Sequence, residues 1–104
     1  MKVSVKNYDR IKRQANVTTE EQRILGFFYN IDDIFDAIKE NELDETNDIL
    51  TEYERYITMD ISSCAYICLT TAISKIPFSW IEKFSKEARK VYGVFMYGYE
   101  NRIK

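Results

Sequence analysis

The segment that decides the fold is ISSCAYICLTTAIS, residues 61–74. It carries no charge, although charged residues make up 31% of the chain. Its apolar residues recur at helical spacing, as Ile61, Ala65, Leu69 and Ala72 show. A helix that is apolar on most of its sides is usually covered by its neighbours. We therefore expect this helix to lie at the centre of the fold and to touch every other helix.

The rest of the chain is also typical of helices. Its 104 residues are 45% apolar and include three glycines and one proline, so few turns are expected. We predict an all-α fold with a single helical domain over residues 18–104, a compact bundle or orthogonal array of four main helices. These helices are expected at about residues 19–40, 45–57, 60–76 and 79–98. Residues 1–17 have a weaker pattern and are predicted to form an N-terminal arm or a short helix.

Local signals place the ends of these helices. They are two overlapping capping boxes (Thr18 with Glu21, Thr19 with Gln22), caps at Asp44 and Asp60, a stop at Pro77, a capping box of Ser79 with Glu82, and an end at Gly98. Gly26 lies inside the first helix, where glycine costs about 1 kcal/mol relative to alanine. We interpret it as space for the close approach of a neighbouring helix.

The sequence lacks the usual catalytic and metal-binding residues. There is no histidine, which removes the commonest general base and the commonest zinc ligand. Cys64 and Cys68 are the only cysteines, and two thiolates fall short of the four ligands of a structural zinc site. We interpret both as reduced core residues, with a subunit contact as the alternative if their face is open. We predict no enzyme activity, no catalytic residue, no metal and no cofactor.

Charge is distributed unevenly along the chain. Residues 1–16 hold five basic and one acidic residue, residues 17–60 hold three basic and thirteen acidic residues, and residues 61–104 hold seven basic and three acidic residues. Such asymmetry marks candidate surfaces for partners, although an acidic helix face is also compatible with simple solvation. The predicted partner-binding acidic face consists of Asp32, Asp33, Asp36, Glu40, Asp44, Glu45 and Asp48. The acidic spacing does not fit an EF-hand or a di-iron bundle.

Two further surfaces are predicted. Tyr97 and Tyr99 are expected to be exposed near the C-terminus, where tyrosine suits a protein interface. The alternative, nucleic-acid contacts, consists of Lys2, Lys6, Arg10, Lys12, Arg13, Lys83, Lys86 and Lys90. We see no signal peptide and no apolar run long enough for a membrane span, so a cytoplasmic protein that does not bind membranes is expected.

Residues 35–93 resemble a group of small, mostly uncharacterised helical proteins encoded by phages. The shared features are Asp48-Ile49-Leu50, an apolar helix that ends in Leu69-Thr70-Thr71, and Pro77 followed by Trp80 and Phe84. This chain lacks the arginine that precedes the two threonines in that group, and its spacing near Pro77 differs. The resemblance implies a phage or mobile-element origin, and therefore a host cytoplasm, but it implies no activity and no site residue.

The function that these observations favour is protein binding. We predict a non-enzymatic helical module that binds and modulates a host or defence protein, or that forms homo-oligomers. A nucleic-acid-binding module that uses the basic N-terminus and the last helix is the alternative.

Overall fold

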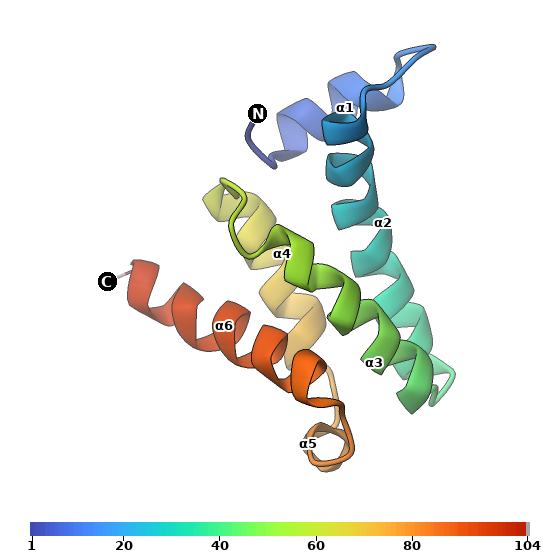
Figure 1. Ribbon diagram of the computed structural model, residues 1–104, viewed down its shortest axis with the longest axis vertical. Helices are drawn as coiled ribbons and strands as arrows, with labels where there is room; N and C mark the ends of the chain where they lie inside the picture. The colour runs from blue at the N-terminus through green and yellow to red at the C-terminus, as the bar shows by residue number, and fades with distance from the viewer. Residues whose placement is uncertain (104) are drawn as a thin grey trace.

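Seven helical segments make up the described part of the chain (Figure 1). The computed structural model describes the backbone of residues 1–103 and the side chains of residues 1–97. The four longer helices are α2 (Thr19–Lys39), α3 (Leu43–Glu52), α4 (Ser63–Ser74) and α6 (Lys86–Ile103). The three short segments are α1 (Val5–Lys12), the 3-10 helix η1 (Tyr53–Tyr56) and α5 (Phe78–Ile81). These residues contain no strand beyond one isolated bridge, so the predicted all-α class is confirmed.

The four longer helices pack in a closed ring. α3 and α4 lie on opposite sides of the ring, and each of them contacts both α2 and α6. Figure 1 shows α3 in front and α4 behind, with α2 on the right and α6 on the left. The core between them contains fully buried side chains, among them Ile24, Leu50, Leu69, Ile73 and Val91. Burying each such side chain contributes about 1.5–3 kcal/mol, so apolar contact is the main force that holds the ring together.

An aromatic cluster joins η1 to three of the long helices. The rings of Tyr53 and Tyr56 are buried, and their centroids lie 5.5 and 5.4 Å from that of Phe27 in α2. Tyr53 also meets Phe95 of α6 at 6.1 Å, and Phe95 meets Tyr66 of α4 at 5.8 Å. The Tyr53 hydroxyl donates a hydrogen bond to the Phe27 carbonyl oxygen. In a 3-10 helix residues three apart share one side, which is why Tyr53 and Tyr56 both face the core.

The position of α4 differs from the prediction of an enclosed central helix. One side of α4, which includes Ala65, Leu69 and Ala72, is buried against α2 and α6. The opposite side carries Cys64 and Cys68, and both thiols are exposed. The prediction that the cysteines lie in the core was therefore wrong. Each helix of a ring turns only one side toward the core, and the other side of α4 faces solvent.

The N-terminal segment is a short helix that is tied into the core. Ser4 caps α1 by accepting a hydrogen bond from the Asn7 amide at 3.1 Å. Val3 is fully buried and forms a single parallel bridge to Ile61, just before α4. Its amide donates to the Asp60 carbonyl oxygen at 2.8 Å, and its carbonyl oxygen accepts from the Ser62 amide at 2.9 Å. The extended residues at the start of the chain thus pair with backbone groups far along the sequence.

Helix capping confirms some of the local predictions and corrects others. The capping box of Thr18 with Glu21 is present at the start of α2. Asp60 does not cap α4, because Ser62 does so by accepting from the Ala65 amide at 3.2 Å. Asp44 does not cap α3, because that helix starts earlier, at Leu43, after Glu42. Asn41, with a φ of 59°, supplies the left-handed residue that ends α2.

The last predicted helix is broken into two. α5 ends at Ile81, and α6 begins only at Lys86. The predicted capping box of Ser79 with Glu82 is absent, since Pro77 precedes α5 and makes no side-chain cap. Ser85 caps α6 instead, because its hydroxyl accepts from the Ala88 amide at 3.1 Å. α6 continues past Gly98 to Ile103, so the prediction that Gly98 ends it was also wrong.

Candidate functional site

All seven predicted acidic residues are exposed, in a region formed by the second half of α2 and by α3. We call this region, which consists of Asp32, Asp33, Asp36, Glu40, Asp44, Glu45 and Asp48, the acidic surface. α2 and α3 pack against each other, and their connection lies at the lower right of Figure 1. None of the seven carboxylates takes part in an ion pair with a described residue. No described basic side chain is therefore paired with the acidic surface.

The acidic surface does not gather its carboxylates as metal ligands. Among the described residues, no group of three or more histidine, cysteine, aspartate or glutamate side chains is placed to hold a metal ion. The carboxylates instead lie spread over two helices. Dispersed charges of one sign suit the recognition of a surface of opposite charge.

Two aromatic residues lie beside the acidic surface on α2. Tyr29 is 48% exposed and Phe35 is 37% exposed. Phe35 follows the buried Ile34 and lies at the edge of the buried side of the helix. Tyr29 precedes Asp32 and Asp33 by about one turn, and its ring packs edge-on against that of Tyr8 at 5.9 Å. The sequence signal for Tyr29 was its place off the apolar stripe of α2, which the prediction of the partner surface did not use.

The predicted aromatic surface near the C-terminus is described in part. Tyr97 is 65% exposed on α6, which agrees with the expectation. The side chain of Tyr99 lies outside the described residues. Tyr97 lies on α6 and the acidic surface on α2 and α3, so these two candidate surfaces belong to different elements.

The predicted basic residues divide into two sets at opposite ends of the molecule. One set lies on and around α1 and the other lies between α5 and the start of α6, as Figure 1 shows along the vertical axis. Three of them are in ion pairs: Arg10 with Glu21 at 3.6 Å, Lys12 with Asp9 at 3.4 Å, and Lys90 with Glu54 at 3.5 Å. The five others, Lys2, Lys6, Arg13, Lys83 and Lys86, are exposed. The fold does not join the two sets into one surface for nucleic acid.

The open side of α4 is a further candidate surface. It carries Cys64, Ile67, Cys68 and Thr71, none of them charged, and Ile67 is 48% exposed. The Thr71 hydroxyl donates to the Ile67 carbonyl oxygen at 2.7 Å, which satisfies it within the helix. We call these four residues the neutral α4 face. A subunit contact was the alternative if the face around the cysteines is open, and this face is open.

Comparison with protein-family models, with curated proteins and with solved structures finds no match. In the part of the chain that the structure describes, every helix is too short or too polar to cross a bilayer.

Proposed function

We propose that the protein is a non-enzymatic interaction module that binds a basic surface of another protein through the acidic surface. The observation that carries this proposal is a set of seven exposed carboxylates without an ion pair to any described residue. Three like-charge pairs lie one turn apart: Asp32 with Asp36, Asp36 with Glu40, and Asp44 with Asp48. Each such pair costs about 0.2–0.5 kcal/mol of helix stability. A cationic partner would offset this repulsion on binding.

The helix dipoles stabilise some charges of the acidic surface and oppose others. Asp44 and Glu45 lie in the first turn of α3, where the positive end of the dipole stabilises them. Asp36 and Glu40 lie at the end of α2, where the dipole is negative and opposes them. Helix stability therefore does not account for the charges at the end of α2, whereas a basic partner does.

The chemistry of the acidic surface indicates the kind of partner. Complementary potentials speed association and select partners, so a surface rich in lysine and arginine is expected, such as one that normally holds nucleic acid. Tyr29 and Phe35 would add apolar contact beside the charges, and tyrosine is frequent among residues that dominate binding energy. If the resemblance to phage proteins reflects the origin of the chain, this partner is a host or defence protein.

Charge reversal tests the proposal with a matched control. The variant Asp36→Lys/Asp48→Lys changes the acidic surface, and Glu82→Lys/Glu87→Lys makes the same change in net charge at exposed positions near the start of α6. We expect the wild type and the control to retain the same protein from a host lysate and the acidic-surface variant to lose it. The Kd of the purified pair should rise with salt concentration. Equal retention by all three proteins, or a Kd insensitive to salt, would contradict the proposal.

The neutral α4 face favours self-association as a second candidate function. Two copies that meet along α4 bring uncharged residues together, whereas contact through the acidic surface would bring like charges together. Light scattering should show a dimer whose population grows with concentration, and Ile67→Lys should abolish it by placing a charge in the contact. A strict monomer at several hundred micromolar wild-type protein would exclude this function.

A further inference from the structure

Two neighbouring hollows lie where the first half of α2 faces η1 and the loop that follows it. The first has a volume of about 490 Å³, and its lining includes Arg23, Gly26, Asn30, Glu52, Arg55 and Tyr56. We call it the arginine hollow. The second, of about 550 Å³, shares Thr19 and Arg23 with it and extends toward Met1. Both begin at the N-terminal end of α2, and the arginine hollow extends along it to Asn30, one turn before Asp33 of the acidic surface.

The arginine hollow concentrates positive charge in the most acidic part of the chain. Residues 17–60 hold three basic residues against thirteen acidic ones, and two of the three, Arg23 and Arg55, line this hollow. Neither forms an ion pair with a described residue. The carboxylate in the lining, Glu52, accepts a hydrogen bond from the Asn30 side-chain amide at 3.2 Å. The lining therefore holds two guanidinium groups and one carboxylate.

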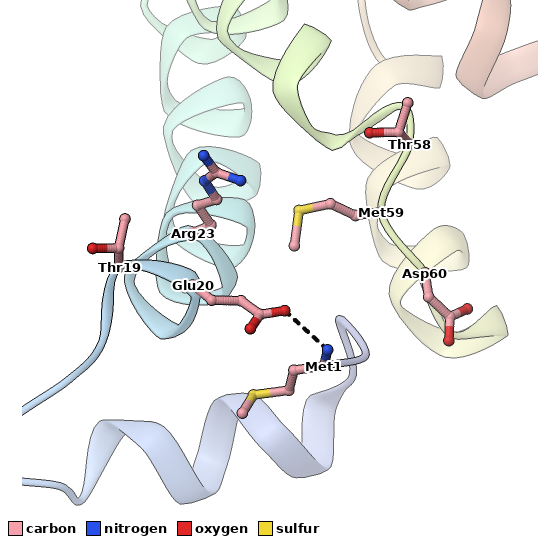
Figure 2. A pocket seen from close by; sticks show the side chains of 7 residues that line it. All are labelled: Met1, Thr19, Glu20, Arg23, Thr58, Met59 and Asp60. Atoms are coloured by element: carbon pink, nitrogen blue, oxygen red, sulfur yellow. Dashed lines mark hydrogen bonds and ion pairs between the residues drawn. The ribbon is translucent and has the colours of Figure 1, made fainter.

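The neighbouring carboxylate of Glu20 does not neutralise Arg23. The amino group of Met1 pairs with Glu20 at 2.9 Å, and Figure 2 shows this pair on one side of the second hollow. In the same view Arg23 extends from α2 away from that pair. The donors of Arg23 are thus available to a molecule in the hollows.

Tyr56 supplies a third donor in a fixed place. The whole residue is only 1% exposed, and its ring packs against those of Phe27 at 5.4 Å and Tyr53 at 5.1 Å. Its hydroxyl lies over Gly26, so close that a Cβ at Gly26 would come within 2.9 Å of the oxygen. This hydroxyl makes no hydrogen bond to a described residue. Among the described side chains, every N or O atom that lacks a partner has some exposure to solvent. The Tyr56 oxygen therefore keeps a small exposure to solvent, and Tyr56 lines the arginine hollow.

The charges of both arginines act on the Tyr56 hydroxyl. Burial raises the pKa of Tyr56, while the positive charge of Arg55, and to a smaller extent that of Arg23, lowers it. Glu52 acts in the opposite direction to the arginines. The two guanidinium groups come from α2 and η1, 32 positions apart in the sequence, and the fold places both beside one phenol.

We propose that Arg23, Arg55 and the Tyr56 hydroxyl form a binding site for an oxyanion, either a carboxylate or a phosphate group. Guanidinium groups bind both through paired N–H donors, and a neutral hydroxyl adds a hydrogen bond without adding charge. Gly26 is the residue that makes room for the hydroxyl in this arrangement. None of these residues belongs to the acidic surface, so the assignment does not rest on the proposed protein-binding function.

Titration of the isotope-labelled whole chain with inorganic phosphate and, separately, with acetate tests the site by NMR. Sodium chloride at matched ionic strength is the reference. We expect saturable shifts at the side-chain N–H groups of Arg23 and Arg55 and at the backbone amide of Gly26. Saturation by acetate alone or by phosphate alone identifies which oxyanion the site takes. Shifts that rise linearly with both anions, or that follow chloride equally, would overturn the proposal.

Three variants separate binding at this site from general attraction to positive charge. Arg23→Gln and Arg55→Gln should each weaken binding by about tenfold or more, since a hydrogen bond to a charged group is commonly worth that factor. Tyr56→Phe should weaken binding a few-fold while the dispersed spectrum of the folded protein is kept. The control Arg89→Gln, which removes an exposed arginine of α6, should leave binding unchanged. An equal loss in the control and in the Arg23 variant would refute the assignment.

Discussion

Substitution of Gly26 by alanine sets two effects of similar size against each other. Alanine favours the helix interior over glycine by about 0.8–1.0 kcal/mol. The new Cβ, however, would lie 2.9 Å from the Tyr56 hydroxyl oxygen, closer than real Cβ contacts come. Because the Tyr56 ring is buried against Phe27 and Tyr53, the hydroxyl has little room to withdraw. Overpacking of this kind costs about 1–3 kcal/mol, so Gly26→Ala should destabilise the protein by about 1 kcal/mol.

A control and a double-mutant cycle isolate the clash from the helix propensity. Gly93→Ala in α6 gains the same propensity, but its Cβ would meet Tyr97 at 3.9 Å, an ordinary contact. It should stabilise the protein by about 1 kcal/mol. In a Tyr56→Phe background the hydroxyl is gone, and Gly26→Ala should then also stabilise by about 1 kcal/mol. The coupling energy between the two substitutions is therefore about 2 kcal/mol.

Urea unfolding followed by circular dichroism measures these free energies directly. Thermal melting gives an independent check, because 1 kcal/mol corresponds to roughly 4–8 °C for a domain of this size. If Gly26→Ala stabilises the wild type as much as it stabilises Tyr56→Phe, the hydroxyl does not press on Gly26. That result would refute the close approach and would also remove the fixed donor from the arginine hollow.

Three further predictions concern stability. Burial raises the pKa of Tyr53 far above its ordinary value of 10.0. Tyr53 should therefore make its full contribution to the free energy of unfolding below pH 10. Above pH 10 that free energy should fall by about 1.4 kcal/mol per pH unit, because the unfolded chain ionises this tyrosine and the folded protein does not. Urea unfolding at alkaline pH should show that Tyr53→Phe removes this slope. Asn47→Ala should cost about 1 kcal/mol in urea unfolding, because the Asn47 side chain accepts the Ser85 amide at 2.8 Å. Thr18→Ala should also cost about 1 kcal/mol by the same measurement, while Thr19→Ala, without a capping hydrogen bond, should cost less.

The results that would contradict these predictions are distinct. A slope above pH 10 that is unchanged in Tyr53→Phe would mean that this tyrosine does not contribute to alkaline unfolding. An Asn47→Ala protein as stable as the wild type would mean that the contact to α6 has no net value. Equal losses in Thr18→Ala and Thr19→Ala would show that the two overlapping capping boxes both operate.

The sequence predicted the long helices because their signals are local. The apolar stripe of α2 and the capping box at Thr18 depend on residues within a few turns of one another. The same is true of Pro77, which follows the end of α4 at Ser74. Such patterns hold whatever the rest of the chain does, and the structure keeps them.

The break between α5 and α6 was not predicted, because its cause is tertiary. The spacing of Trp80, Phe84 and Ala88 fits a continuous helix, and all three are buried. The structure instead turns the chain at residues 82–85, where the Ser85 amide is held by Asn47 of α3. That hydrogen bond joins residues 38 positions apart, and the sequence around Ser85 does not predict its partner.

The exposed side of α4 was misread for a chemical reason. Cys64, Cys68 and Thr71 recur at helical spacing, and they are among the weakly polar members of an uncharged segment. Cysteine is among the most buried residue types, so the pattern was interpreted as core. The aliphatic residues on the other side, such as Leu69 and Ile73, are the ones that the fold buries. On α4 the thiol and hydroxyl groups of this stripe lie on the solvent side together with the exposed Ile67.

The candidate sites differ in the same way, because one depends on local sequence signals and the other on tertiary contacts. The acidic surface follows from neighbouring charges on α2 and α3, so its residues were identified from the sequence. The arginine hollow was missed, because Arg23 and Arg55 come together only when η1 folds onto α2. The charge count of residues 17–60 does not reveal such a pair, because thirteen acidic residues outnumber the two arginines. Arg23 and Arg55, neither in an ion pair with a described residue, line one hollow beside the buried Tyr56, and the net charge of the chain does not reveal this arrangement.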